Sequence, residues 1–243
     1  MTPTVTQDSI WSALRTFLAE ILPSNVGAAN IIQAQVNRVA QPRDDDFVVM
    51  TLLRRGRLAT NQDTLLDAVF LGSIAGDILT ITEVVEGSLA AGQHVFGTGI
   101  EAGTLVTGTV GGTGGIGTYR VSPSQTVASG TISGGQVLAM QETQISVQID
   151  VHGPNSADNA QVISTLMGDD YASTRISAIS GGVLSPLYAE DPRQMPFTNE
   201  QQQVENRWIV GVELQINPAV SIPQEFAGVV EVQPLDVDAT YPV

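Results

Sequence analysis

The chain has 243 residues, of which 42% are hydrophobic and 14% are charged, so it can bury one core and a second, smaller one. Its formal net charge is −15 and all ten basic residues are arginine, which argues against free binding to nucleic acid phosphates. Without cysteine there are no disulfides, zinc–thiolate sites or thiol nucleophiles. No basic and apolar leader opens the chain and no run of about 18 apolar residues occurs, so neither a signal peptide nor a membrane span is expected.

The first part of the chain predicts a helix followed by two strands. Apolar residues from Ile10 to Ile21 recur with helical spacing, Thr6 or Asp8 can cap the start, and Pro23 ends the pattern. The segments that read as strands are residues 31–36 and 47–53.

Residues 71–140 differ in composition from both flanks. They hold sixteen of the 24 glycines and only five charged residues, and glycine turns separate short β-rich runs. The flanks carry helical periodicity and 11 of the 12 prolines. We therefore interpret the chain as a host domain, residues 1–70 and 141–243, interrupted by an inserted all-β module at 71–140. The runs expected in the module are 78–85, 93–96, 104–110, 118–121 and 126–132.

The second part of the host predicts further strands and a second helix. Residues 143–152 alternate between apolar and polar, as in a half-buried strand. Asn155 or Ser156 can cap a helix at 157–167, and Gly168 follows its end. Strands and two helices indicate an α+β host, a mixed β-sheet with flanking helices. The remaining expectations are an ordered loop with three prolines at 186–199 and strands at 208–216 and 228–232.

Two motifs resemble ligand sites only locally. Residues 112–117 match G-x-G-x-x-G, but dinucleotide binding needs a helix after this loop, and strand-like residues follow it here. We expect a β-turn and no cofactor. Asp44, Asp45 and Asp46 lack the ligand spacing of a calcium loop, so a solvated turn is expected. His94 stands without a second histidine nearby, which argues against a metal.

Asp150, His152 and Ser156 offer the residue types of a hydrolytic triad. Asp150 and His152 share a strand face, being two residues apart. A triad also needs a base within reach of the serine and an oxyanion hole. We favour a structural His152 at a strand end and a helix-capping Ser156, with no catalytic residues, and keep a hydrolase as the minor alternative.

Arg54, Arg55 and Arg57 form the densest basic cluster of this acidic chain. One interpretation is a solvated strand end. The other is an arginine patch that pairs with carboxylates of a neighbouring subunit through bidentate hydrogen bonds. Composition leaves both open.

Four stretches of the flanks together carry a likeness to known proteins. They are LRTFL (14–18) with ILP (21–23); QAQVNRV (33–39) running to FVVMT (47–51); QIDVHGP (148–154) with residues 158–160; and PLYAEDPRQMPF (186–197) with RW (207–208). The combination resembles the neck terminator, or tail terminator, proteins of tailed bacteriophages. The glycine-rich segment resembles β modules that recur in phage structural proteins.

The resemblance implies a structural virion protein, not an enzyme. It would form a homohexameric ring in the neck that caps the tail tube, joins it to the head-side connector and also meets the sheath protein if the tail is contractile. Genomic DNA would pass through without specific binding, no membrane would be involved, and assembly would take place in the host bacterial cytoplasm. Interface-type residues offer a hypothesis for the contacts: Arg54, Arg55, Arg57, Tyr188, Asp191, Arg193, Phe197 and Arg207.

A second hypothesis assigns the chain to carbohydrate- or receptor-binding phage modules, led by the glycine-rich segment. Sugar sites usually present exposed aromatic rings, and residues 71–140 offer only Phe96 and Tyr119. This scarcity counts against the second hypothesis, which binding in a glycan-array screen would support.

Overall fold

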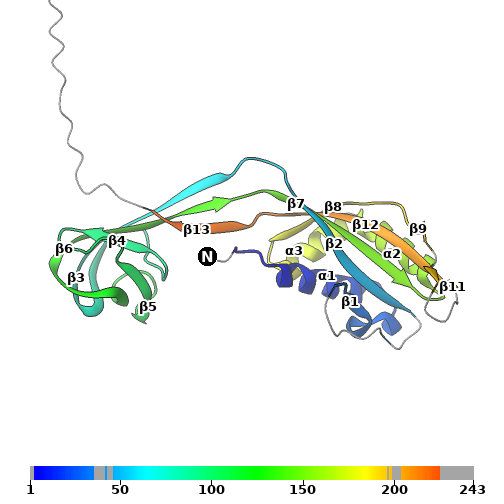
Figure 1. Ribbon diagram of the computed structural model, residues 1–243, viewed down its shortest axis with the longest axis horizontal. Helices are drawn as coiled ribbons and strands as arrows, with labels where there is room; N and C mark the ends of the chain where they lie inside the picture. The colour runs from blue at the N-terminus through cyan, green and yellow to red at the C-terminus, as the bar shows by residue number, and fades with distance from the viewer. Residues whose placement is uncertain (1–2, 36–41, 43–45, 196, 199–203, 225–243) are drawn as a thin grey trace, which may run out of the picture. The chain divides into compact units, whose positions relative to one another are not determined.

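The computed structural model describes residues 3–35, 42, 46–195, 197–198 and 204–224 (Figure 1). The chain divides into two compact units. Unit 1 comprises Met1–Asp63 and Ala139–Val220. Unit 2 comprises Thr64–Leu138 and Ser221–Val243. Of the second segment, the structure describes residues 221–224. The fold is mixed, with sheets that account for most of the structure and few helices, consistent with the α+β class.

The sheet of unit 1 has the order β1-β2-β7-β12-β8, and β9 also pairs with β12. The β1–β2 pair is parallel and the pairs of β12 and β7 are antiparallel. A separate short pair joins β10 to β11. The strands are β1 Ile31–Gln33, β2 Phe47–Arg57, β7 Thr143–His152, β8 Leu184–Ala189, β9 Arg193–Gln194, β10 Phe197–Thr198, β11 Val204–Glu205 and β12 Arg207–Ile216.

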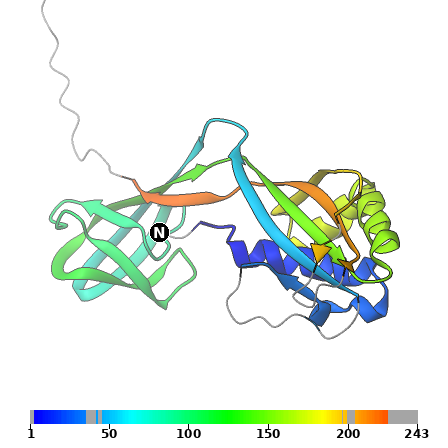
Figure 2. The same ribbon diagram turned by 45° about the vertical axis from the view of Figure 1, so that its right-hand side comes forward.

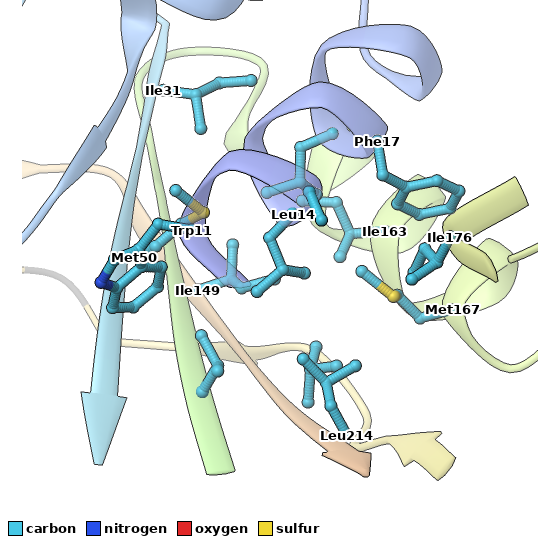
Figure 3. Packing of buried hydrophobic residues seen from close by; sticks show 14 of the residues in the cluster. Trp11, Leu14, Phe17, Ile31, Met50, Ile149, Ile163, Met167, Ile176 and Leu214 are labelled. Atoms are coloured by element: carbon cyan, nitrogen blue, oxygen red, sulfur yellow. The ribbon is translucent and has the colours of Figure 1, made fainter. Parts of the chain in front are cut away.

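The helices of unit 1 cover one face of this sheet (Figures 1 and 2). Apolar side chains of β2, β7 and β12 alternate along the strands and meet those of the helices in one core, as Figure 3 shows for Met50, Ile149 and Leu214. The helices are α1 Gln7–Ile21, α2 Ser156–Met167 and α3 Asp170–Ser180, with short 3-10 turns at Ser24–Val26 and Ala28–Asn30.

Helix α1 confirms the first sequence prediction. Thr6 is its N-cap and exchanges hydrogen bonds with Ser9, so the cap is Thr6, and Asp8 lies within the first turn. Leu14 and Phe17 are fully buried, and Phe17 lies beside Ile176 of α3 (Figure 3). The helix ends at Ile21, before Pro23.

Several element predictions were wrong in extent or in kind. The 186–199 loop is instead largely extended, because β8 forms an edge strand in which Pro186 can do without an N–H donor. Helix α3 was not predicted at all. The first predicted strand ends at Gln33, since Gln35 takes φ +62° in a turn, and β2 runs on to Arg57. Strand β13, Ala219–Pro223, was not predicted, and the strand expected at 228–232 lies outside the described residues.

Unit 2 contains strands and no helix among its described residues. Its sheet has the order β13-β6-β4-β5, with β3 also paired to β6. Two long extended elements replace several of the short runs expected from the sequence. That unit 2 is an insertion able to fold by itself stays a prediction. The strands are β3 Gln62–Glu86, β4 His94–Gly97, β5 Leu105–Gly111 and β6 Gly117–Met140.

Strand β3 folds back on itself near Gly76, which has φ +68°. The hydroxyl of Thr82 donates to the carbonyl of Leu71 at 3.1 Å, and a Cβ on Gly72 would lie 2.5 Å from the Thr80 oxygen. A side chain at Gly72 would therefore collide with the returning arm of the strand. This close approach is one physical reason for glycine in the segment.

Candidate interface on the sheet of unit 1

The face of the unit 1 sheet opposite the helices carries polar side chains. Gln144, Ser146, Gln148, Asp150 and His152 of β7 point to this side, because their neighbours fill the core. In the described part of the chain no helix covers this face (Figures 1 and 2). We call it the polar face; strand β12 contributes Arg207 and Glu213 to it.

A partly buried ion pair lies at one end of the polar face. Arg207 donates to Asp150 Oδ1 from Nη2 at 2.5 Å and from Nε at 2.9 Å, and Gln148 Nε2 donates to the same carboxylate. The Asp150 side chain is 7% exposed and that of Arg207 26%. Arg207, predicted as an interface residue, is thus engaged within its own chain, a role that the sequence did not suggest.

A second carboxylate is bound by neutral groups. Gln144 Nε2 and Ser146 Oγ donate to Glu213 Oε2 at 2.9 and 2.8 Å. The cross-strand partner of Glu213 on β7 is Ser146, so the sheet register brings these groups together. The polar face is therefore a hydrogen-bonded surface whose two carboxylates already have donors.

His152 lies at the end of β7 and stacks on Phe47 of β2. The ring centroids are 4.4 Å apart and the planes differ by 6°. Burial lowers the pKa of His152, the charge of Asp150 raises it, and Arg207 lowers it further. The stacking packs His152 against the start of β2; that its role is structural stays a prediction.

The expected capping role of Ser156 was wrong, because Asn155 takes the N-cap position of α2 and Ser156 is the first helical residue. The side chain of Asn155 does not cap the helix. Instead its backbone N–H and Nδ2 donate to Asp46, at 3.0 and 2.7 Å. Asn25 Nδ2 also donates to Asp46, at 3.2 Å.

Asp46 is consequently not part of a solvated turn. It is 4% exposed and joins the start of β2, the loop at Asn25 and the beginning of α2. A carboxylate next to a helix N-terminus also interacts favourably with the helix dipole. Asp44 and Asp45 lie outside the described residues.

The arginines predicted as an interface patch lie on the second half of β2. Arg54, Arg55 and Arg57 are exposed. The side-chain amide of Gln141 lies against the Arg57 guanidinium and can accept from it with the amide oxygen turned towards Arg57. Among the described residues, neither Arg54 nor Arg55 has an acidic partner, as the ion pairs found use Arg120, Arg175, Arg193 and Arg207.

The other predicted interface residues lie near the opposite edge of the sheet. Tyr188 on β8 is half-exposed, and Asp191 is exposed in the turn that follows. Arg193 on β9 donates to Glu190 at 2.8 Å, an exposed pair. Phe197 is placed only as a backbone position of β10, and its side chain is outside the described part. The predicted residues therefore flank the sheet in two separate groups.

The glycine motif at 112–117 lies in the loop between β5 and β6, and Tyr119 closes that loop. Tyr119 is fully buried; its hydroxyl accepts from Gly114 N and donates to the Gly115 carbonyl. A buried ring cannot stack on a sugar, so Tyr119 does not support the carbohydrate-binding hypothesis. Phe96 is only half-buried.

The described ranges offer neither a metal-ligand cluster nor a candidate membrane helix. There, no group of three or more histidine and carboxylate side chains comes together to hold an ion. No helix found in those ranges is long and apolar enough to cross a bilayer.

Comparison with known proteins identifies the family to which the chain belongs. The sequence model of the phage neck terminator protein family matches residues 108–238, more than half of the chain. The match begins within β5 and includes β7, α2, α3 and β12, and therefore the polar face. No curated protein matches the chain.

Proposed function

The chain belongs to the phage neck terminator protein family and is a structural neck protein of a bacteriophage, and from this premise we propose that it is the subunit of a ring that caps the tail tube. The ring would join the tube to the head-side connector, and would contact a sheath protein if the tail is contractile. Six subunits are what the family resemblance implies. The proposed location is the neck of the virion, after assembly in the bacterial cytoplasm.

The observation that supports this proposal most is the polar face of unit 1. A sheet covered by helices on one side leaves its other side for partners, and here that side carries polar side chains that are hydrogen-bonded to one another. Asp150 and Glu213 both accept from fixed donors, an arrangement that suits a preorganised contact surface better than acid–base chemistry. We propose a contact role for this face and no catalytic residue.

The exposed arginines supply a second part of the proposal. In a chain with a net charge of −15, Arg54 and Arg55 are suited to carboxylates on a neighbouring subunit or on the tail tube protein. Tyr188 and Asp191 are proposed as contacts at the other edge. Arg207 is proposed to position the Asp150 carboxylate through its two hydrogen bonds.

We also propose that unit 2 is a glycine-rich β module inserted into the neck protein. The regular elements among its described residues are all strands, and its apolar core is separate from that of unit 1. The chain leaves unit 1 after Asp63 and returns at Ala139.

Passage of DNA fits the charge of the chain. Phosphate contacts release counterions and would hold the genome, whereas an acidic wall repels phosphates weakly over a Debye length of about 8 Å. The expectation is that the purified ring shows no salt-sensitive binding of duplex DNA at low ionic strength. Tight binding that weakens steeply with salt would instead indicate a ring that grips DNA.

The experiment that tests the ring is electron microscopy of the purified chain, alone and mixed with tail tubes. The proposal predicts rings with a central hole that sit at tube ends. Arg55→Glu and Arg193→Glu should abolish rings or tube capping while the chain stays folded by circular dichroism. Arg120→Glu, a reversal at another exposed arginine, is the matched control and should assemble normally. Compact monomers that ignore tube ends would contradict the proposal.

A further inference from the structure

Strand β2 has an open edge along its second half. Strand β1 is in register with Val48–Met50 only, and the Ala34 N–H donates to the Met50 carbonyl just beyond it. The other edge of β2 stays paired with β7 as far as Arg57, with a register shift between Leu52 and Arg54 that leaves Leu53 without a facing residue on β7. From residue 51 to residue 57, one edge therefore carries no strand among the described residues. Such an edge presents unpaired N–H and C=O groups in strand geometry.

The side chains along this edge give it a distinct chemistry. Leu53 is 60% exposed, and Arg54 and Arg55 are exposed without an acidic partner in the described part of the chain. Arg54 lies along its own strand, since a Cβ on Gly56 would be 3.3 Å from the guanidinium. The edge is thus cationic, with one apolar side chain, on a protein of strongly negative charge.

A second copy of the chain contains a segment with the opposite character. Residues 225–243 contain Glu225, Glu231, Asp236 and Asp238 and no basic residue. Residues 226–233 contain no proline, include one phenylalanine and three valines, and are followed by Pro234. This segment of eight residues is long enough to pair along the seven residues, 51–57, of the open edge.

We propose that residues 226–233 of a second copy add to the open edge of β2 as an extra strand. Backbone hydrogen bonds would supply affinity. Glu231 within the segment, with Glu225 and Asp236 flanking it, would pair with Arg54 and Arg55 to fix its register. The arginines also prevent two β2 edges from pairing with each other, because like charges would face one another. The same residues thus exclude one partner and select the other.

The pairing joins two different surfaces. Each copy therefore adds its segment 226–233 to one neighbour and binds the segment of another neighbour at its own β2 edge. Repetition of such a head-to-tail contact closes into a ring when the rotation allows it. In this respect the inference rests on the proposed ring, although strand addition itself needs only two copies.

Because the chain contains no cysteine, any disulfide in a crosslinking test must join the introduced cysteines. Leu53→Cys is combined, in the full-length chain, with a single cysteine at each position from 228 to 233 in turn. Paired strands place facing Cα atoms within the range that a disulfide spans, and facing positions recur every second residue. After mild oxidation, non-reducing gels should show multimers crosslinked between chains. The crosslinked bands should be strong for every second cysteine position from 228 to 233 and weak for the positions between them.

The controls separate strand addition from chance contact. Tyr171→Cys, an exposed position on α3, replaces Leu53→Cys and should give no alternation. Arg54→Glu with Arg55→Glu should lower the crosslinked fraction about tenfold, and Glu231→Arg with Asp236→Arg should restore it. Crosslinks equal to the Tyr171→Cys control, without alternation, or formed only within one chain would overturn the inference. Imaging of the same samples tests the ring independently. Rings without this crosslink would contradict only the strand addition, and crosslinked multimers that never form rings would contradict only the proposed ring.

Discussion

Asp150 on β7 and Arg207 on β12 form an ion pair, with Arg207 Nη2 2.5 Å from Asp150 Oδ1, on the face of the sheet that no described helix covers. The carboxylate is nearly buried and the guanidinium is partly exposed. The pair therefore fixes the polar face at the point where His152 and Phe47 also pack.

Arg207→Ala should destabilise the chain by about 3 kcal/mol, because it leaves the Asp150 carboxylate buried without its cation. Urea unfolding of the purified protein measures this difference. Arg193→Ala is the matched control; its exposed pair with Glu190 should contribute less than about 1 kcal/mol. Equal losses in the two variants would show that Asp150 does not depend on Arg207.

Asp46→Ala should cost about 1–3 kcal/mol, since it leaves the Asn155 N–H and amide without an acceptor at the start of α2. Ser156→Ala should cost less, because Ser156 is not the capping residue. Thermal unfolding of both variants tests this order. A larger loss for Ser156→Ala would restore the capping role expected from the sequence.

The buried His152 should make stability fall in acid. Its pKa is lowered in the folded state, chiefly by burial, so the unfolded chain takes up the proton more readily. Its contribution is therefore fully present above the ordinary histidine pKa of about 6.5 and declines as pH falls from there towards the folded pKa. His152→Phe keeps an aromatic ring against Phe47 and removes the titration. The loss of unfolding free energy between neutral pH and about pH 5 should be smaller in this variant than in the parent chain; an identical loss would refute the assignment.

Replacement of residues 64–138 by a short Gly/Ser linker should leave unit 1 folded. The Leu58 N–H donates to the Glu142 carbonyl at 3.0 Å, so the outgoing and returning segments lie side by side and a short linker can join them. The two units also have separate cores. A cooperative thermal transition is expected. A variant that exposes its core, seen by dye binding, would show that the two units fold as one.

Sequence patterns predicted the elements whose burial follows a simple period. Strand β7 was found because Ile145, Val147, Ile149 and Val151 alternate with polar residues and fill the core. Helix α3 was missed because only Ala172 and Ile176 of it are buried and its Arg175 binds Glu20 on α1. Its ends, however, carry local signals: Asp169 caps the start and Gly181 takes φ +68° after the last turn.

The polar face was beyond sequence reasoning for a different reason. Glu213 and its donor Gln144 are 69 residues apart, and Asp150 and Arg207 are 57 apart. Only the antiparallel register of β7 and β12 brings them together. The prolines of the 186–199 region suggested a loop for a different reason. An edge strand tolerates a residue that has no N–H to donate on its open side.

Localisation of this chain in a reconstruction of the assembled virion neck tests the central claim most directly. The account predicts a closed ring of identical copies at the head-proximal end of the tail tube, with an open channel for DNA. It further predicts that the exposed arginines, Arg54 and Arg55, lie between subunits or on the rim and not along the channel. Finding the chain at the distal tip, as isolated copies, or with these arginines lining the channel would contradict the account.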